Sequence, residues 1–286
     1  MKKVILSFML VAFVLAGCNE KPDLDEEREV VIFFSARSLS TSLKSSDSES
    51  ENNIQKIILF GVDEQSSVVK KFAVDNPSLS GEMLTIPRKI KTLYAIANPT
   101  SKIDGANPTD VSEILGMTIE YVTPPYLSQN SVFLMSGKAD IISKAANIPL
   151  VRTVAKINIT GINGFQITSV TVQNTSSSGY VFQKTPLSVP VDKTNYDPIT
   201  ESDPTFYIAE NTISNSTNFV INGQLSGKPA QYTILQLTKD GGTPVAIQRN
   251  TYYKVVITPI TEDECSIKVN IPDWDYIETD EYIFPD

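Results

Sequence analysis

The residues that could carry chemistry in this chain of 286 residues are serines, lysines and carboxylates, because the sequence contains no histidine. That composition excludes Ser-His-Asp and Cys-His catalysis, the common zinc sites and the facial-triad iron sites. Ser67-Val-Val-Lys70 has the S-x-x-K spacing of serine acyl-transferases, but it lies in a strand-like segment without the two accompanying motifs of that class. We interpret it as a chance match.

The carboxylates give no clear sign of a metal site or of a catalytic site. Glu262-Asp263-Glu264 and the pair Asp273/Asp275 lack the glycine and the spaced ligands of a calcium loop, so solvated turns are the favoured interpretation. No glycine-rich phosphate loop is present. A carboxylate pair for glycoside hydrolysis stays open, because the fold and not the sequence sets its spacing. We therefore predict no catalytic residues, no metal and no cofactor, with a carboxylate glycosidase as the weakest alternative.

Net charge and cysteine content bear on nucleic-acid binding and on disulfide formation. The formal net charge is −9 and no long basic cluster is present, so we predict no nucleic-acid partner. The two cysteines are Cys18 and Cys265. If a lipid modifies Cys18, no intrachain disulfide can form. Cys265 begins a strand with alternating apolar residues, and we expect its thiol to be buried and inert.

The chain opens as a secretory signal. Lys2-Lys3 precedes an apolar run of twelve residues from Val4 to Leu15, shorter than the roughly 17 to 25 residues of a membrane-spanning helix. Leu15-Ala16-Gly17-Cys18 then fits a lipobox. We predict a signal peptide at 1–17, a lipid on Cys18 and an acidic tether at 18–28. The alternative is an ordinary signal peptide with an incidental cysteine.

The first strand follows the tether. Val30, Val31, Ile32, Phe33 and Phe34 form an unbroken apolar run, which predicts a buried strand whose burial contributes up to ~8–15 kcal/mol. Residues 38–53 are rich in serine, which predicts an exposed loop.

Arg37 lies between that strand and that loop, so a protease could cut after it. The mature chain would then begin at Ser38. The alternative is that Arg37 is simply a solvated charge at a strand end.

Short apolar runs separated by turn residues predict an all-β chain of two antiparallel β-sandwich domains, at 29–150 and 151–286. Asp110 and Glu113 form a capping pair, which predicts one short helix ending at Gly116. The segment 174–202 is rich in Ser, Thr, Pro and Asn and is expected to run over the surface. The predicted strands are 55–62, 68–74, 83–86, 92–97, 132–136, 154–160, 166–173, 205–210, 217–222, 230–237, 251–260 and 264–271.

The C-terminal tail continues past the last predicted strand and is a candidate donor strand for another subunit. Its large apolar residues are Trp274, Tyr276, Ile277, Tyr282 and Phe284. Glu278 and Asp280 fall on the side of Trp274 and Phe284, however, and burying them without partners would be unfavourable. The alternative is an edge strand that folds back on its own domain.

Six short runs in one order resemble the fimbrillin family, the lipoprotein precursors of type V pili in Bacteroidales. The runs are residues 93–98, 135–137, 151–157, 206–211, 248–255 and Trp274. The resemblance implies two transthyretin-like sandwiches, export as a lipoprotein, and an arginine-specific protease that removes the first strand. The emptied groove would accept a strand from another pilus subunit.

By this resemblance Cys18 matches the lipidated cysteine and Arg37 is the best-placed cleavage arginine, although only 19 residues separate them. The leading hypothesis is a pilus subunit of the outer membrane surface, polymerised by donor-strand exchange. The alternatives are a basal anchor or a monomeric surface lipoprotein that binds glycan or protein.

Overall fold

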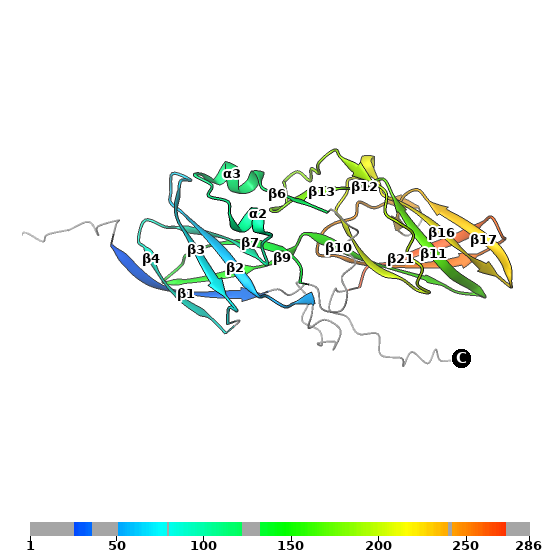
Figure 1. Ribbon diagram of the computed structural model, residues 1–286, viewed down its shortest axis with the longest axis horizontal. Helices are drawn as coiled ribbons and strands as arrows, with labels where there is room; N and C mark the ends of the chain where they lie inside the picture. Colours follow the sequence, from blue (N-terminus) through cyan, green and yellow to red (C-terminus); the bar gives the residue numbers. More distant parts are fainter. Residues whose placement is uncertain (1–25, 36–50, 79, 122–131, 240–241, 273–286) are drawn as a thin grey trace, which may run out of the picture.

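The computed structural model describes residues 26–35, 51–78, 80–121, 132–239 and 242–272. Two halves built from β-strands lie end to end along its long axis (Figure 1). The helical elements within these ranges are α2 (Ser101–Asp104), α3 (Val111–Gly116) and the 3-10 turn η1 (Ile213–Asn215). None of the described helices is long and apolar enough to cross a membrane. The predicted all-β class is confirmed.

The N-terminal half contains two facing sheets. The larger has the order β3-β2-β5-β7-β9, and all its neighbours are antiparallel. The smaller has the order β4-β1-β8. Their bounds are β1 (Glu27–Ser35), β2 (Lys56–Val62), β3 (Val68–Asp75), β4 (Glu82–Pro87), β5 (Thr92–Ala97), β7 (Met135–Asp140), β8 (Ala145–Pro149) and β9 (Val151–Arg152).

Alternation along β2 places apolar side chains on both faces of the larger sheet. Ile57 and Leu59 face the smaller sheet and contribute to a core that we call the β1 core. Ile58 and Phe60 face the other way, into a second core that includes Ile114 of α3; we call this the helix core. The larger sheet is therefore the middle layer of three, which explains why β2 is apolar almost throughout.

The C-terminal half packs a sheet of order β15-β10-β20-β21 against a sheet of order β11-β16-β17, with a third apolar core that includes residues of both sheets. The bounds are β10 (Val154–Gly161), β11 (Phe165–Gln173), β15 (Thr205–Ala209), β16 (Asn218–Leu225), β17 (Lys228–Ile234), β20 (Tyr252–Pro259) and β21 (Cys265–Asn270). Shorter strands are β6 (Thr118–Glu120), β12 (Thr175–Ser176), β13 (Ser178–Tyr180), β14 (Lys193–Thr194), β18 (Thr238–Lys239) and β19 (Thr243–Pro244).

Three sequence expectations need correction. The segment 174–202 does not simply cross the surface: it forms β12, β13 and β14, and Phe182 and Tyr196 are buried in the helix core and the C-terminal core. The strand expected at 132–136 begins only at Met135. Cys265 is half-buried rather than buried, although burial still raises the pKa of its thiol.

Two strand pairs are parallel, where the sequence predicted antiparallel pairing. They are β1 with β8 and β10 with β20. Each pair joins strands that are distant in the chain, so no hairpin turn fixes the direction of one strand relative to the other. The helix prediction at 110–116 holds: Asp110 accepts a hydrogen bond from the Glu113 amide at 3.0 Å, and Glu113 accepts one from the Thr109 amide at 2.7 Å.

The start of β10 links the two halves. Val154 belongs to the β1 core, whereas Ala155, Ile157 and Ile159 belong to the C-terminal core. The predicted alternation along this strand thus sends neighbouring side chains into different cores. A domain boundary near residue 150 stays a proposal, which this change of core from one residue to the next supports.

A buried polar cluster ties residues 51 and 52 to this junction. Arg152 is fully buried, and its guanidinium donates to the Glu51 carbonyl at 3.4 Å, to Asn250 Oδ1 at 2.9 Å and to Asn52 Oδ1. Glu51 and Asn52 precede β2 in the sequence. The start of β2 is therefore fixed to β9 and to the turn before β20 by side chains as well as by the sheet.

The carboxylate of Glu51 is the acceptor of the same cluster. Lys156 Nζ donates to it at 2.8 Å and the Tyr207 hydroxyl also donates to it. Burial, followed by the neighbouring Glu51, raises the pKa of Tyr207, so this phenol stays a donor across the physiological range. Removal of the carboxylate would leave buried donors without their acceptor, which is more damaging than losing an exposed ion pair.

Candidate functional site

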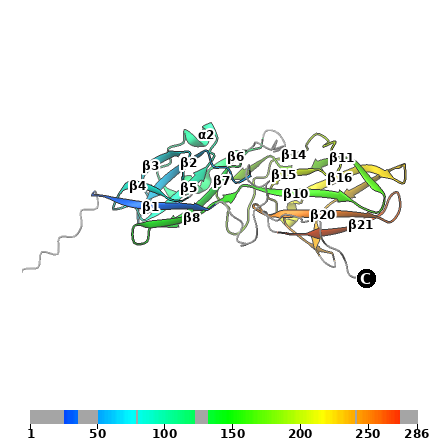
Figure 2. The same cartoon turned by 90° about the horizontal axis from the view of Figure 1, so that it is seen from below.

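The candidate site is the position of β1 between two neighbours (Figure 2). On one side β1 pairs antiparallel with β4, with Val30 opposite Leu84. On the other side it pairs parallel with β8, with Phe34 opposite Ile148. We call this place between β4 and β8, with the β1 core beneath it, the β1 site. A strand that occupies it satisfies two hydrogen-bond ladders at once.

Burial alternates along β1, and this corrects the prediction of five buried residues. Val30 and Ile32 are fully buried and Phe34 is 4% exposed, whereas Phe33 is 37% exposed and Val31 is half-buried. The inner residues enter the β1 core. The outer face is covered only in part, where Gly81 lies beside Phe33 and Val31. Sequence alone does not reveal whether a sheet has a second covering layer.

The corrected burial lowers the energy that β1 contributes through its side chains. Three buried side chains at ~1.5–3 kcal/mol each give ~5–9 kcal/mol, an upper bound because the unfolded chain already hides part of this surface. A domain is stable by only ~5–15 kcal/mol. Loss of β1 would therefore remove a large fraction of the stability of the N-terminal half.

The polar side chains of β1 contribute little to stability and mainly fix the orientation of the strand. Arg28 Nη2 donates to the Ile90 carbonyl at 2.9 Å. Glu27 pairs with Lys70 at 3.4 Å, and residue Glu26, directly before β1, pairs with Arg88 at 2.8 Å. Both ion pairs are exposed, and such pairs stabilise proteins by at most about 1 kcal/mol. The β1 site thus recognises mainly backbone and three alternating apolar side chains.

The other sequence-predicted site residues lie outside the described residues. These are Cys18, Arg37, Ser38, Trp274, Tyr276, Ile277, Tyr282 and Phe284. Their lipid, cleavage and donor roles remain predictions. Within the described residues, no group of three or more His, Cys, Asp or Glu side chains is placed to hold a metal ion.

Sequence reasoning missed the second neighbour of β1. The sequence predicts no strand between 136 and the domain boundary near residue 150, yet β8 lies there. The backbone of β8 passes so close to β7 that position 137 must be a glycine. A Cβ on Gly137 would lie 2.0 Å from the Pro149 carbonyl oxygen. The glycine in the run 135–137 was a signal of such an approach, but a sequence does not identify the approaching strand.

The fold, two β-sandwich halves in one chain, matches known structures. No family model and no curated protein matches the sequence. The tip fimbrial protein Mfa3 from Porphyromonas gingivalis, with C-terminal truncation, matches with a TM-score of 0.62 at 15% identity, over 86% of this chain and 100% of that chain.

Two further structures have the same fold. A fimbrial assembly protein from Parabacteroides distasonis ATCC 8503 matches with a TM-score of 0.57 at 14% identity, over 87% of this chain and 99% of that one. The fimbrial anchor protein Mfa2 from Porphyromonas gingivalis gives 0.51 at 8% identity, over 87% and 98%. The resemblance to Bacteroidales fimbrial proteins is confirmed at the level of the fold.

The alternation along β1 predicts very different effects of substitutions at adjacent residues. Ile32→Ala should lower the free energy of unfolding of the N-terminal half by about 2–5 kcal/mol, because it leaves a cavity in the β1 core. Phe33→Ala, its matched neighbour, should cost less than about 1.5 kcal/mol, because that ring is partly exposed. Urea unfolding measures both, and equal losses would contradict the assigned faces.

Proposed function

We propose that the chain is a structural pilus subunit that polymerises by strand exchange at the β1 site. Fimbrial proteins of the same fold support a place in a fimbrium or a role in cell adhesion at the cell surface. The observation that carries the proposal is the place of β1 itself. It is a central strand held by two ladders and three inner side chains, so another strand with apolar residues at i, i+2 and i+4 could replace it.

Export and trimming would prepare the site. In this proposal a lipid on Cys18 holds the precursor in the outer membrane, and an arginine-specific protease cuts between Arg37 and Ser38. Loss of β1 would leave the inward edges of β4 and β8 unpaired, and unpaired edges readily capture another strand. The cluster around Arg152 would keep Glu51, and thus the start of β2, in place after the cut.

The C-terminal tail of a second copy is the proposed donor, and its sequence suggests a register. Residues 278–284 read E-T-D-E-Y-I-F, and residues 26–32 read E-E-R-E-V-V-I. Aligned in this way, Tyr282 takes the place of Val30, Phe284 takes that of Ile32, and Glu278 takes that of Glu26 beside Arg88.

The same register has three weak positions. Asp280 takes the place of Arg28, whose guanidinium donates to the Ile90 carbonyl. Pro285 takes the place of Phe33 but has no amide hydrogen for a ladder.

Asp286 falls at the place of Phe34, so the tail supplies two of the three inner apolar residues. A donor from a different subunit with three such residues would bind more tightly, because each apolar side chain adds ~1.5–3 kcal/mol when buried.

The second candidate function is a basal anchor, or a surface lipoprotein that does not polymerise. The likeness to the anchor protein Mfa2 favours it. Such a protein would keep its lipid and β1. The same fold would then remain an uncleaved protein that does not exchange its first strand. The state of the N-terminus on the native cell surface distinguishes this candidate from the pilus subunit.

Cleavage is tested by substitution of Arg37. Arg37→Ala should trap a monomer that carries lipid, and N-terminal sequencing of wild-type surface protein should begin at Ser38. Arg37→Lys is the matched control, because an arginine-specific protease should reject it although a trypsin-like protease would accept it. Polymer ladders from Arg37→Ala at wild-type levels, or wild-type surface protein that still carries Cys18 and its lipid, would contradict the proposal.

Donation by the tail is tested at the C-terminus. Deletion of residues 276–286, or Tyr282→Ala with Phe284→Ala, should give monomers that still unfold cooperatively but form no polymer ladder. Ile283→Ala is the control, because residue 283 takes the place of the half-buried Val31 in the proposed register. If the deletion unfolds the C-terminal half, or if ladders persist, the tail belongs to its own subunit.

A further inference from the structure

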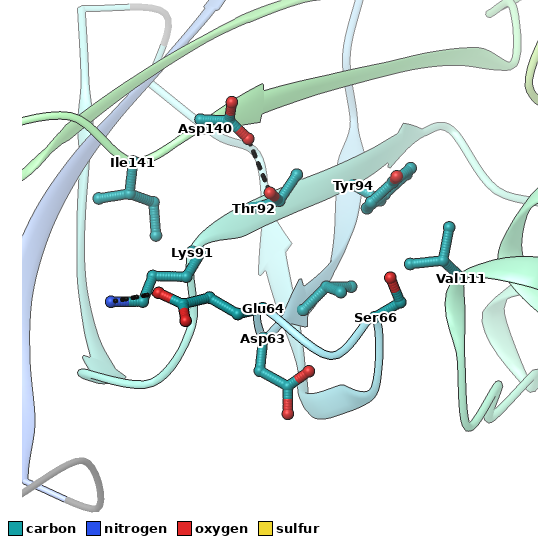
Figure 3. A pocket seen from close by; sticks show the side chains of 10 residues that line it. Asp63, Glu64, Ser66, Lys91, Thr92, Tyr94, Val111, Asp140 and Ile141 are labelled. Atoms are coloured by element: carbon teal, nitrogen blue, oxygen red, sulfur yellow. Dashed lines mark hydrogen bonds and ion pairs between the residues drawn. The ribbon is translucent and has the colours of Figure 1, made fainter.

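A second site lies on the other side of the larger sheet from β1. A cavity of about 460 Å³ opens between the β2–β3 turn, the start of α3, the start of β5 and the end of β7 (Figure 3). Its apolar wall includes Val62, Tyr94 and Val111, which all belong to the helix core or pack against it. The volume is within the ~300–1,000 Å³ of small-ligand sites.

The carboxylates of this cavity already have partners in its wall. Asp63 accepts hydrogen bonds from the backbone amides of Gln65 and Ser67 at 3.0 and 2.8 Å. Glu64 pairs with Lys91 at 3.5 Å. Asp140 Oδ1 accepts the Thr92 hydroxyl at 2.7 Å, as the dashed line in Figure 3 marks. Each carboxylate thus has a partner, but three carboxylates and one ammonium leave the lining negative, which disfavours an anionic ligand.

The Tyr94 hydroxyl is open to the cavity, although most of this side chain is buried. Its side chain is only 6% exposed, and its ring makes an edge contact with Phe182 at a centroid distance of 5.5 Å. Its hydroxyl has no hydrogen-bond partner among the described residues, and the residue lines the cavity. The hydroxyl can therefore hydrogen-bond a ligand that enters the cavity.

The remaining polar groups can both donate and accept. The Tyr94 hydroxyl can donate, the Thr92 hydroxyl keeps lone pairs after donating to Asp140, and the Ser66 hydroxyl can do either. Ser66 has a φ of 66°, a left-handed conformation that favours glycine, yet the residue carries a hydroxyl at the cavity. Neutral hydroxyls beside an apolar wall match a ligand that has hydroxyls on an apolar ring.

We propose that this cavity binds a neutral sugar residue of a glycan. The Tyr94, Thr92 and Ser66 hydroxyls would hydrogen-bond the sugar hydroxyls, and Val62 and Val111 would contact its apolar face. The cavity shares no residue with the strands β4, β1 and β8. Sugar binding therefore does not rest on strand exchange, and either can fail without the other.

The test uses the full-length chain on an array of neutral and charged glycans, followed by titration with the free monosaccharide that the bound glycans share. Tyr94→Phe and Thr92→Val each remove one hydroxyl and should each weaken binding about tenfold. Tyr94→Phe should leave the urea midpoint unchanged, because the lost hydroxyl has no partner in the described protein. Tyr180→Phe, outside the cavity, is the matched control and should bind as wild type.

Each result decides the proposal. Binding of neutral glycans that both cavity variants weaken and the control does not is the expected result. Absence of glycan binding, binding only of acidic glycans, or neutral-glycan binding that survives Tyr94→Phe and Thr92→Val would overturn it.

Discussion

The structure depends on one interaction, the burial of Val30, Ile32 and Phe34 of β1 in the core between two sheets. These three side chains close the N-terminal sandwich while β1 completes a sheet between β4 and β8. The side-chain term of ~5–9 kcal/mol is of the same size as the stability of a whole domain. A strand that contributes up to this much through so few side chains is a major source of stability for the N-terminal half, yet another segment with the same simple pattern could take its place.

The helix core and the junction between the two halves do not depend on which strand occupies the β1 site. The larger sheet is apolar on both faces, so it keeps the helix core covered whichever strand fills the β1 site. The cluster of Arg152, Glu51, Lys156 and Tyr207 fixes the start of β2 to the junction between the halves. Because these groups are buried or, for Lys156, half-buried and bond one another, they favour a single arrangement there.

Local patterns predicted the local features well. The alternation in β10 and the cap at Asp110 were read correctly because each depends on neighbours in the chain. The parallel partner of β1, the exposed ring of Phe33 and the burial of Arg152 were not foreseen, because each depends on segments distant in sequence. The cavity at Tyr94 was missed for the same reason: its lining comes from four separate elements. Cleavage, lipid and donor residues rest on sequence and resemblance alone.

The most direct measurement is replacement of β1 by a free peptide. A chain that begins at Ser38 is mixed with a synthetic peptide of residues 26–35, and thermal unfolding is followed as the peptide concentration rises. If β1 can be replaced by another strand, the shortened chain should be markedly less stable alone. The peptide should then raise its Tm in a saturable way. The same peptide with Ile32→Asp should have no effect, because it would bury an unpaired charge. Unchanged Tm of the shortened chain without peptide, or equal stabilisation by both peptides, would contradict the account.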